Sequence, residues 1–176
     1  ALADLAPVHH ADLTLDDSVA GMAARVLATA PPVFALAGLS MGGYVAFEIL
    51  RQAPQRVARL ALLDTSARTD PPKRLAVRKA GLALAESGRF AGVTRKLLPQ
   101  LVHESRVESE VGEEVMAMAQ RVGRDAFLRQ QRAIIDRPDS LPLLPAIAVP
   151  TLIGVGEDDR MTLPEESRLL HERIPG

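Results

Sequence analysis

Residues 33–44 read VFALAGLSMGGY, a short apolar run followed by a glycine-rich turn and the start of a helical pattern. The run at 33–37 is typical of a strand buried on both faces of a parallel sheet. Residues 44–52 have a helical pattern, and the apolar run at 57–63 predicts a second buried strand. A strand, a helix and a strand at this spacing form a βαβ unit, which predicts a parallel sheet with a right-handed crossover.

The turn after the first strand carries the pattern Gly-x-Ser-x-Gly at Gly38, Ser40 and Gly42. A nucleophile on such a turn takes a strained backbone conformation and projects its side chain out of the sheet. We expect a Cβ at Gly38 or Gly42 to collide with the chain, and Gly43 to let the helix pack closely on the strand. The N–H of Met41 is aimed at the space above Ser40, where an oxyanion would develop. The pattern predicts a nucleophilic serine; the alternative is a tight turn with an incidental serine.

These residues resemble the α/β-hydrolase superfamily, in its branch of small esterases and lactonases with a helical cap. Residues 38–67 resemble the nucleophile region of that family, and residues 150–176 resemble its acid-bearing segment and the helix after it. The resemblance implies an α/β fold with a parallel-sheet core. It also implies that Ser40 is the nucleophile and that Met41 supplies one N–H of the oxyanion hole.

The resemblance also implies a catalytic acid after a late strand, in the loop that reads GEDD at 156–159. Asp159 fits the family spacing best, Asp158 fits it second best, and Asp64 holds a position that some relatives use. Paired aspartates before a helix also complement the positive helix N-terminus without any catalytic role. The identity of the acid therefore stays open among these three residues.

Residues 68–140 contain no buried-strand pattern, which predicts a helical cap inserted into a core made of 1–67 and 141–176. Apolar residues recur at helical spacing around 73–85, 91–102, 111–122 and 125–135. The candidates for the inner face of the cap are Phe90, Met116, Met118 and Phe127.

The two ends of the core carry weaker patterns. Residues 7–13 predict a short strand, and a capping box that begins at Thr14 predicts a helix over 15–29. In the family's strand order, one more strand lies between 7–13 and 33–37. We therefore expect the two strands of the βαβ unit and a third at 149–155 to form a contiguous sheet. Residues 7–13 should then lie one empty position away from that sheet.

The chain has four histidines, His9, His10, His103 and His171. His171 lies in a predicted helix over 164–174, where it interacts with the helix dipole. His103 lies in the predicted cap, where it either lines a pocket or is solvated. The family triad runs serine, acid, histidine in chain order. The resemblance therefore implies a fragment truncated at both ends, with the catalytic histidine and half of the oxyanion hole outside these 176 residues. Such a fragment is expected to be nearly inactive alone.

Composition excludes several classes of protein. Apolar residues make up 47% and charged residues 24%, which is typical of a globular protein. The 21 basic and 22 acidic residues nearly cancel, which argues against a nucleic-acid partner. No apolar run is long enough to cross a bilayer, and no signal-peptide pattern is present, so we expect a cytoplasmic protein without a membrane partner. The absence of cysteine and of metal-ligand spacing among the histidines predicts no metal and no cofactor.

The residues and the resemblance together predict a serine hydrolase that cleaves small carboxylic esters or lactones through an acyl-enzyme on Ser40. One alternative is an acyltransferase or perhydrolase that uses the same serine. A second is a ligand-binding protein of the same fold that does not turn over its ligand.

Overall fold

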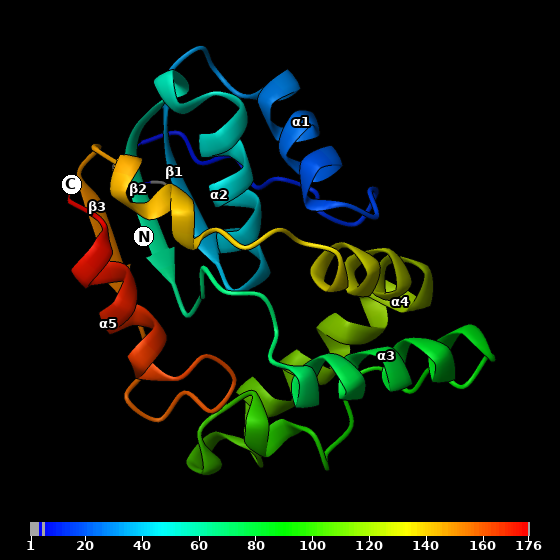
Figure 1. Ribbon diagram of the computed structural model, residues 1–176. Coiled ribbons are helices and arrows are strands. Elements are labelled where there is room, and N and C mark those ends of the chain that lie inside the picture. Colours follow the sequence, from blue (N-terminus) through cyan, green and yellow to red (C-terminus); the bar gives the residue numbers. More distant parts are fainter. Residues whose placement is uncertain (1–3, 5, 176) are drawn as a thin grey trace.

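Three parallel strands form a sheet in the computed structural model, which describes residue 4 and residues 6–175 (Figure 1). They are β1 (Phe34–Leu39), β2 (Val57–Leu63) and β3 (Thr151–Gly154), in the order β1-β2-β3. The register places Leu39, Leu63 and Gly154 side by side at the carboxyl edge. The predicted contiguous parallel sheet is confirmed.

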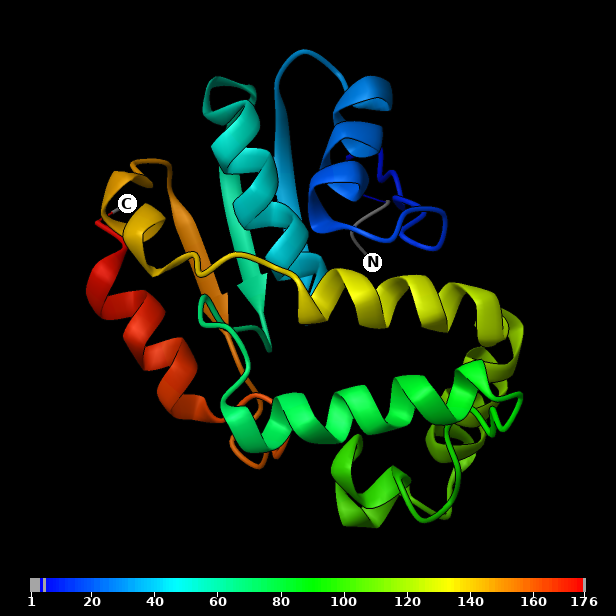
Figure 2. The ribbon, with the colours of Figure 1, turned by 45° about the vertical axis from the view of Figure 1, so that its right-hand side comes forward.

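Helices pack on one face of this sheet. α2 (Met41–Gln52) contacts β1 and β2, α1 (Val19–Thr29) packs on α2, and α5 (Pro164–Arg173) contacts β3 (Figure 2). The largest fully buried apolar side chains between these elements are Phe47, Met22, Ile49, Leu62, Leu144 and Leu170. None of the helices in the described part of the chain combines the length and apolar character needed to cross a bilayer.

The opposite face of the sheet is open among the described residues. Ala35, Ala37 and Leu39 of β1 are exposed, and Leu152 of β3 is 64% exposed. The prediction that the first strand is buried on both faces is therefore wrong for this chain. Its continuous apolar sequence does not distinguish one covered face from two, because the residues on both faces are apolar.

Residues 68–140 hold two long helices and short 3₁₀ turns, and none of these residues is in a strand (Figure 2). α3 (Pro72–Glu86) packs against α4 (Glu110–Ile135). Gly123, at φ 76° and ψ 175°, breaks α4 into two pieces, in agreement with the two apolar periods in this region. The period around 91–102 forms only a 3₁₀ turn at Leu98–Gln100, in which Leu98 is the buried residue.

The segment 7–13 is not a strand, which corrects the prediction made from its sequence. Most of it is exposed, and it pairs with none of the described strands. The carbonyl of Thr14 instead accepts a hydrogen bond from Arg129 Nε at 2.7 Å, and that of Leu13 accepts one from Gln130 Nε2 at 3.2 Å. Side chains of α4 thus hold the end of this segment. It makes no ladder with β1, and its predicted position one strand spacing from β1 stays a prediction.

The first helix begins later than the capping box predicts. Ser18 is the N-cap of α1, and its Oγ accepts the N–H of Gly21 at 3.2 Å. The hydroxyl of Thr14 donates instead to Asp12 at 2.6 Å. A serine or threonine bonds as readily to a nearby carboxylate in a turn as to a helix N-terminus, so the pattern alone does not locate the cap.

The helical segment leaves and rejoins the core at one place, where Arg137 is buried. Its Nη2 donates to Asp70 Oδ1 and to the carbonyl of Arg68, both at 2.9 Å. Its Nη1 donates to the carbonyl of Ile134 at 2.7 Å, and the guanidinium lies 4.2 Å from the ring centroid of Tyr44 on α2. One side chain therefore joins both ends of the helical segment to α2.

Asp70 completes this cluster from the other side. Its Oδ2 accepts from Arg78 Nε of α3 at 2.7 Å, and its side chain is only 3% exposed. Burial would raise the pKa of Asp70, but the hydrogen bonds from Arg137 and Arg78 outweigh it and hold the pKa below its ordinary value of 3.8. Asp70 is therefore a carboxylate at neutral pH, and its two oxygens are shared between Arg137 and Arg78.

Replacing Arg137 with alanine should lower the free energy of unfolding by about 3 kcal/mol, because it removes one partner of a buried carboxylate. Urea denaturation of the intact protein measures this. The control is Arg168→Ala, which removes an exposed ion pair to Glu165 and should cost less than about 0.5 kcal/mol. Equal losses for the two variants would contradict the structural role of Arg137.

The contribution of Asp70 also predicts a pH dependence. Because its pKa is lower in the folded protein, its stabilisation is complete above the ordinary value of 3.8 and is lost as the pH falls through the folded pKa. In urea titrations from pH 5 downward, Asp70→Asn should therefore lose stability less steeply than the unchanged protein. Parallel curves would show that Asp70 carries none of the acid sensitivity.

Candidate active site

Ser40 lies at the turn between β1 and α2, with φ 51° and ψ −114°. A non-glycine residue with positive φ is strained, and this conformation persists only where surrounding contacts impose it. Its N–H donates to the carbonyl of Leu63 at 2.9 Å, and its carbonyl accepts from Thr65 Oγ1 at 2.8 Å. Contacts from the β2 side therefore hold both backbone groups of Ser40.

Two glycines allow this turn to be so tight. A Cβ at Gly38 would lie 2.5 Å from the carbonyl oxygen of Gly42, and a Cβ at Gly43 would lie 2.2 Å from Thr65 Oγ1. A Cβ at Gly42 would meet nothing within 4 Å, so the predicted steric requirement at Gly42 is wrong. The close approach is between the backbone of Gly42 and the α-carbon of Gly38, and it restricts only the latter.

Met41 directly follows Ser40, which is the N-cap of α2, and it is not among the residues that line the pocket with Ser40. Met41 is the first residue of α2, so its N–H has no acceptor within the helix. The N-terminus of a twelve-residue helix also places partial positive charge there. The position of Met41 is thus compatible with the predicted role of an oxyanion donor.

The loop after β3 brings the acidic candidates to the same edge of the sheet. Asp159 Oδ1 accepts the N–H groups of Met161 at 2.7 Å and Thr162 at 2.8 Å. Among the hydrogen bonds of the described residues, Asp159 Oδ2 makes none, so one oxygen of an oriented carboxylate is available to a partner. The side chain of Asp158 is 75% exposed and lacks this support.

Asp64 supports the loop from β2. It has φ 45°, and its Oδ1 accepts the N–H of Gly156 at 3.0 Å. Its own N–H donates to the carbonyl of Gly154 at 2.9 Å. These two bonds fasten the end of β3 to the end of β2, which explains the position of Asp64 without a role as the acid.

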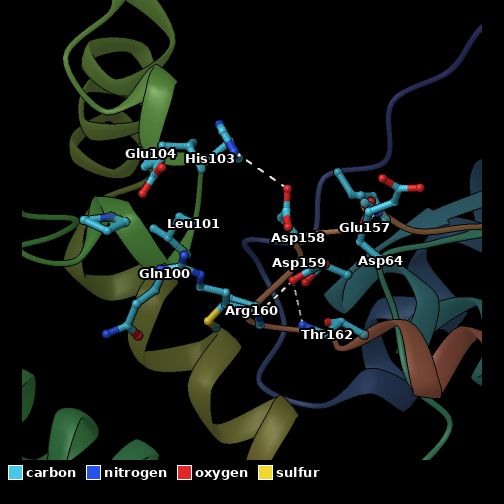
Figure 3. Close-up of a pocket in the computed structure, with 16 residues that line it drawn as sticks. Asp64, Gln100, Leu101, His103, Glu104, Glu157, Asp158, Asp159, Arg160 and Thr162 are labelled. Carbon is cyan, nitrogen blue, oxygen red and sulfur yellow. Dashed lines mark hydrogen bonds and ion pairs between the residues drawn. The ribbon is translucent and has the colours of Figure 1, made fainter.

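A cavity of about 540 Å³ joins these groups. Ser40, Asp64 and Asp159 line it from the sheet edge, and residues 99–104 line it from the helical segment. Figure 3 shows His103 and Glu104 on one side of the cavity and Asp64 and Asp159 on the other. The structure therefore brings the predicted nucleophile and all three candidate acids to one pocket.

His103 lines this pocket but is not oriented as a base for Ser40. Its Nδ1 accepts the N–H of Ser105 at 3.3 Å, which places the proton of a neutral ring on Nε2. Its Nε2 lies 3.7 Å from Asp158 Oδ2 (Figure 3). The hydrogen bond of Nδ1 and the ion-pair contact of Nε2 are therefore with residues other than Ser40. The side chain of His103 is 53% exposed, so it is partly solvated while it also lines the pocket, and each of the two predicted positions is correct in part.

The other histidines and the cap candidates lie elsewhere. His171 is in the last turn of α5, as predicted, and neither His9 nor His10 lines the pocket. Phe90 and Phe127 contact each other, with ring centroids 5.3 Å apart and ring planes tilted by 46°. Neither of them, nor Met116 or Met118, lines the pocket with Ser40. The described side chains form no group of three or more acids and histidines that could hold a metal ion.

Sequence reasoning missed two features of the site. The first is Thr65, which is 1% exposed and holds the Ser40 carbonyl. Polar residues directly after a buried strand are the signal that could have found it, because the carboxyl edge of a parallel sheet is where sites form. The second is the segment 99–104, whose sequence carries no comparable signal.

Comparison with known proteins places this chain among hydrolases. The family model described as serine aminopeptidase, S33, matches residues 7–176. The pimeloyl-[acyl-carrier protein] methyl ester esterase of Neisseria meningitidis is 29% identical over 165 residues, which are 89% of this chain. The chain spans 61% of the length of that relative.

Solved structures give the same result for the fold. A thermophilic esterase from Thermogutta terrifontis superposes with a TM-score of 0.77 at 31% identity, over 90% of this chain and 61% of that one. The enol-lactonase from Burkholderia xenovorans has a TM-score of 0.75 at 24% identity, over 90% of this chain and 62% of its own, and this likeness concerns the fold alone.

The glycines of the turn yield a matched pair of variants. Gly43→Ala should lower the free energy of unfolding by about 1–3 kcal/mol, because its Cβ overlaps Thr65. Gly42→Ala adds the same methyl group to the same helix in open space, and should leave stability unchanged or raise it by up to about 1 kcal/mol. Thermal and urea denaturation compare the two. A larger loss at Gly42 would show that the turn is packed differently.

Proposed function

Because this chain belongs to the serine aminopeptidase S33 family of α/β-hydrolases, we propose that the protein hydrolyses small carboxylic esters or lactones through an acyl-enzyme on Ser40. The observation that carries the proposal is the strained backbone of Ser40 at the N-terminus of α2, in a pocket shared with an oriented carboxylate. A strained serine with no reaction to perform would cost stability without a compensating use.

The chemistry assigns one role to each group. Ser40 Oγ attacks the carbonyl carbon, an Oγ–C bond forms, and the carbonyl electrons move onto oxygen beside the Met41 N–H. The base, which lies outside residues 1–176, takes the Ser40 hydroxyl proton during the attack. It gives this proton to the leaving oxygen as the C–O bond of the ester breaks, so that an alcohol forms. Water attacks the acyl-enzyme in the second half, which releases the acid and restores the Ser40 hydroxyl.

Asp159 is the residue that we assign as the acid of the triad. Its Oδ1 is held by two backbone N–H groups, and its Oδ2 is available to orient a protonated histidine nitrogen. Asp64 is committed to the N–H of Gly156, and Asp158 is mostly exposed. Because His103 is not oriented toward Ser40, we expect residues 1–176 alone to be nearly inactive, with the base supplied from outside them.

Residues 68–140 are the cap in this proposal. Their turns at 99–104 line the pocket opposite the sheet edge, and Arg137 fastens both ends of the segment to α2. A cap attached in this way shapes the pocket while the nucleophile stays on the rigid core. Substitutions at 99–104 are therefore expected to change substrate preference more than the rate of the chemical step.

Ser40→Ala should lower kcat for short-chain nitrophenyl esters by roughly 10⁵-fold or more in the intact protein, because no other group forms the acyl-enzyme. Circular dichroism and the melting temperature show whether the variant is folded. Retention of more than about a tenth of the activity would contradict the assignment. Transfer of the acyl group to an added alcohol in preference to water would favour the acyltransferase alternative.

The acid is tested by three matched amide variants. Asp159→Asn should lower kcat by about 10⁴-fold, because the base loses its orienting carboxylate. Asp158→Asn and Asp64→Asn make the same change and should lower kcat far less. The order of the three kcat values is the measurement, and the largest loss at Asp64 or Asp158 would move the acid to that residue.

A further inference from the structure

The pocket that holds Ser40 is strongly acidic, although the chain as a whole has a net charge of only −1. The acidity is therefore local to this cavity. Among the described residues that line it, Arg160 is the only one with a permanent positive charge. The carboxylates that line it are Asp64, Glu104, Glu157, Asp158 and Asp159.

The two inner carboxylates belong to the frame of the site. Asp64 and Asp159 each accept backbone N–H groups of the loop after β3. The three outer carboxylates, Glu104, Glu157 and Asp158, are exposed at the pocket. None of the lysines or arginines among the described residues pairs with an outer carboxylate, and Asp158 Oδ2 lies 3.7 Å from His103 Nε2.

The outer carboxylates come from both walls of the pocket. Glu104 extends from the helical segment beside His103, whereas Glu157 lies with Asp64 on the sheet side (Figure 3). A substrate that enters toward Ser40 therefore passes between negative charges on two sides. A cleft lined by one sign of charge focuses its field and changes the local concentration of charged ligands.

We propose that this acidic mouth selects esters and lactones that carry no negative charge, and favours those that carry an ammonium group. The inference rests on the proposed function, because it names the substrates of the same pocket. A carboxylate on the substrate would be repelled by the carboxylates of Glu104 and Glu157. The guanidinium of Arg160 would offset this repulsion in part. The acid released by hydrolysis is itself an anion, so the same charges favour its departure.

Binding to the Ser40→Ala variant tests the inference without turnover. The ligands are methyl esters of equal chain length that end in a methyl, a trimethylammonium or a carboxylate group, and isothermal titration calorimetry on the intact protein gives each Kd. At low salt we expect the carboxylate ester to bind at least about tenfold more weakly than the neutral ester, and the ammonium ester to bind more tightly. Salt should reduce both differences, because exposed charges are screened.

The double substitution Glu104→Gln and Glu157→Gln in the same variant should reduce the ratio of the carboxylate to the neutral Kd to below about threefold. Its matched control is Glu172→Gln, which removes an exposed acid of α5 that does not line the pocket and should leave the ratio unchanged. Equal affinity for the neutral and carboxylate esters, or a ratio that the double substitution does not change, would overturn the inference.

Turnover of the neutral ester by the unsubstituted protein is measured separately. Ser40-dependent hydrolysis without charge discrimination in binding would retain the proposed function and overturn the inference. Charge discrimination in binding without Ser40-dependent hydrolysis would support the inference and contradict the proposed function.

Discussion

The backbone of Ser40 is held at φ 51° by the strand beside it, and the arrangement of the site depends on this constraint. Such a conformation costs about 1–3 kcal/mol, which the surrounding structure has to offset. The carbonyl of Leu63 and the hydroxyl of Thr65 bind the two backbone groups of Ser40. Gly38 and Gly43 allow the chain to approach closely enough for these bonds to form.

The same edge of the sheet organises the rest of the pocket. Asp64 follows β2 directly and fastens the loop after β3 through Gly156, so the acidic loop is positioned by the strand that also holds Ser40. Tyr44, one turn into α2, lies under the guanidinium of Arg137, where both ends of the helical segment meet. Ser40, the acidic loop and the helical segment 68–140 are therefore attached to one small group of elements.

The sequence predicted the parts that depend on local patterns. The strand at 57–63 has the predicted bounds, and the helix after Ser40 begins three residues earlier than its apolar pattern indicated. The sequence could not show that 7–13 is not a strand, because a strand forms only where a partner strand lies beside it. It could not show that one face of the sheet is exposed either, because burial depends on which elements pack on that face. The steric prediction for Gly42 was wrong because the glycine pattern shows that two backbone segments approach closely, but not which of the two glycines lacks room for a Cβ.

The position of His103 could not be predicted either, because the orientation of its ring is set by Ser105 and Asp158.

The central claim, that the strained Ser40 is a nucleophile, is tested most directly by covalent labelling. The intact protein is treated with a fluorophosphonate, and the modified peptide is identified by mass spectrometry. We predict one adduct, on Ser40, that is absent from the heat-denatured protein; an adduct on another residue, or none, would contradict the claim.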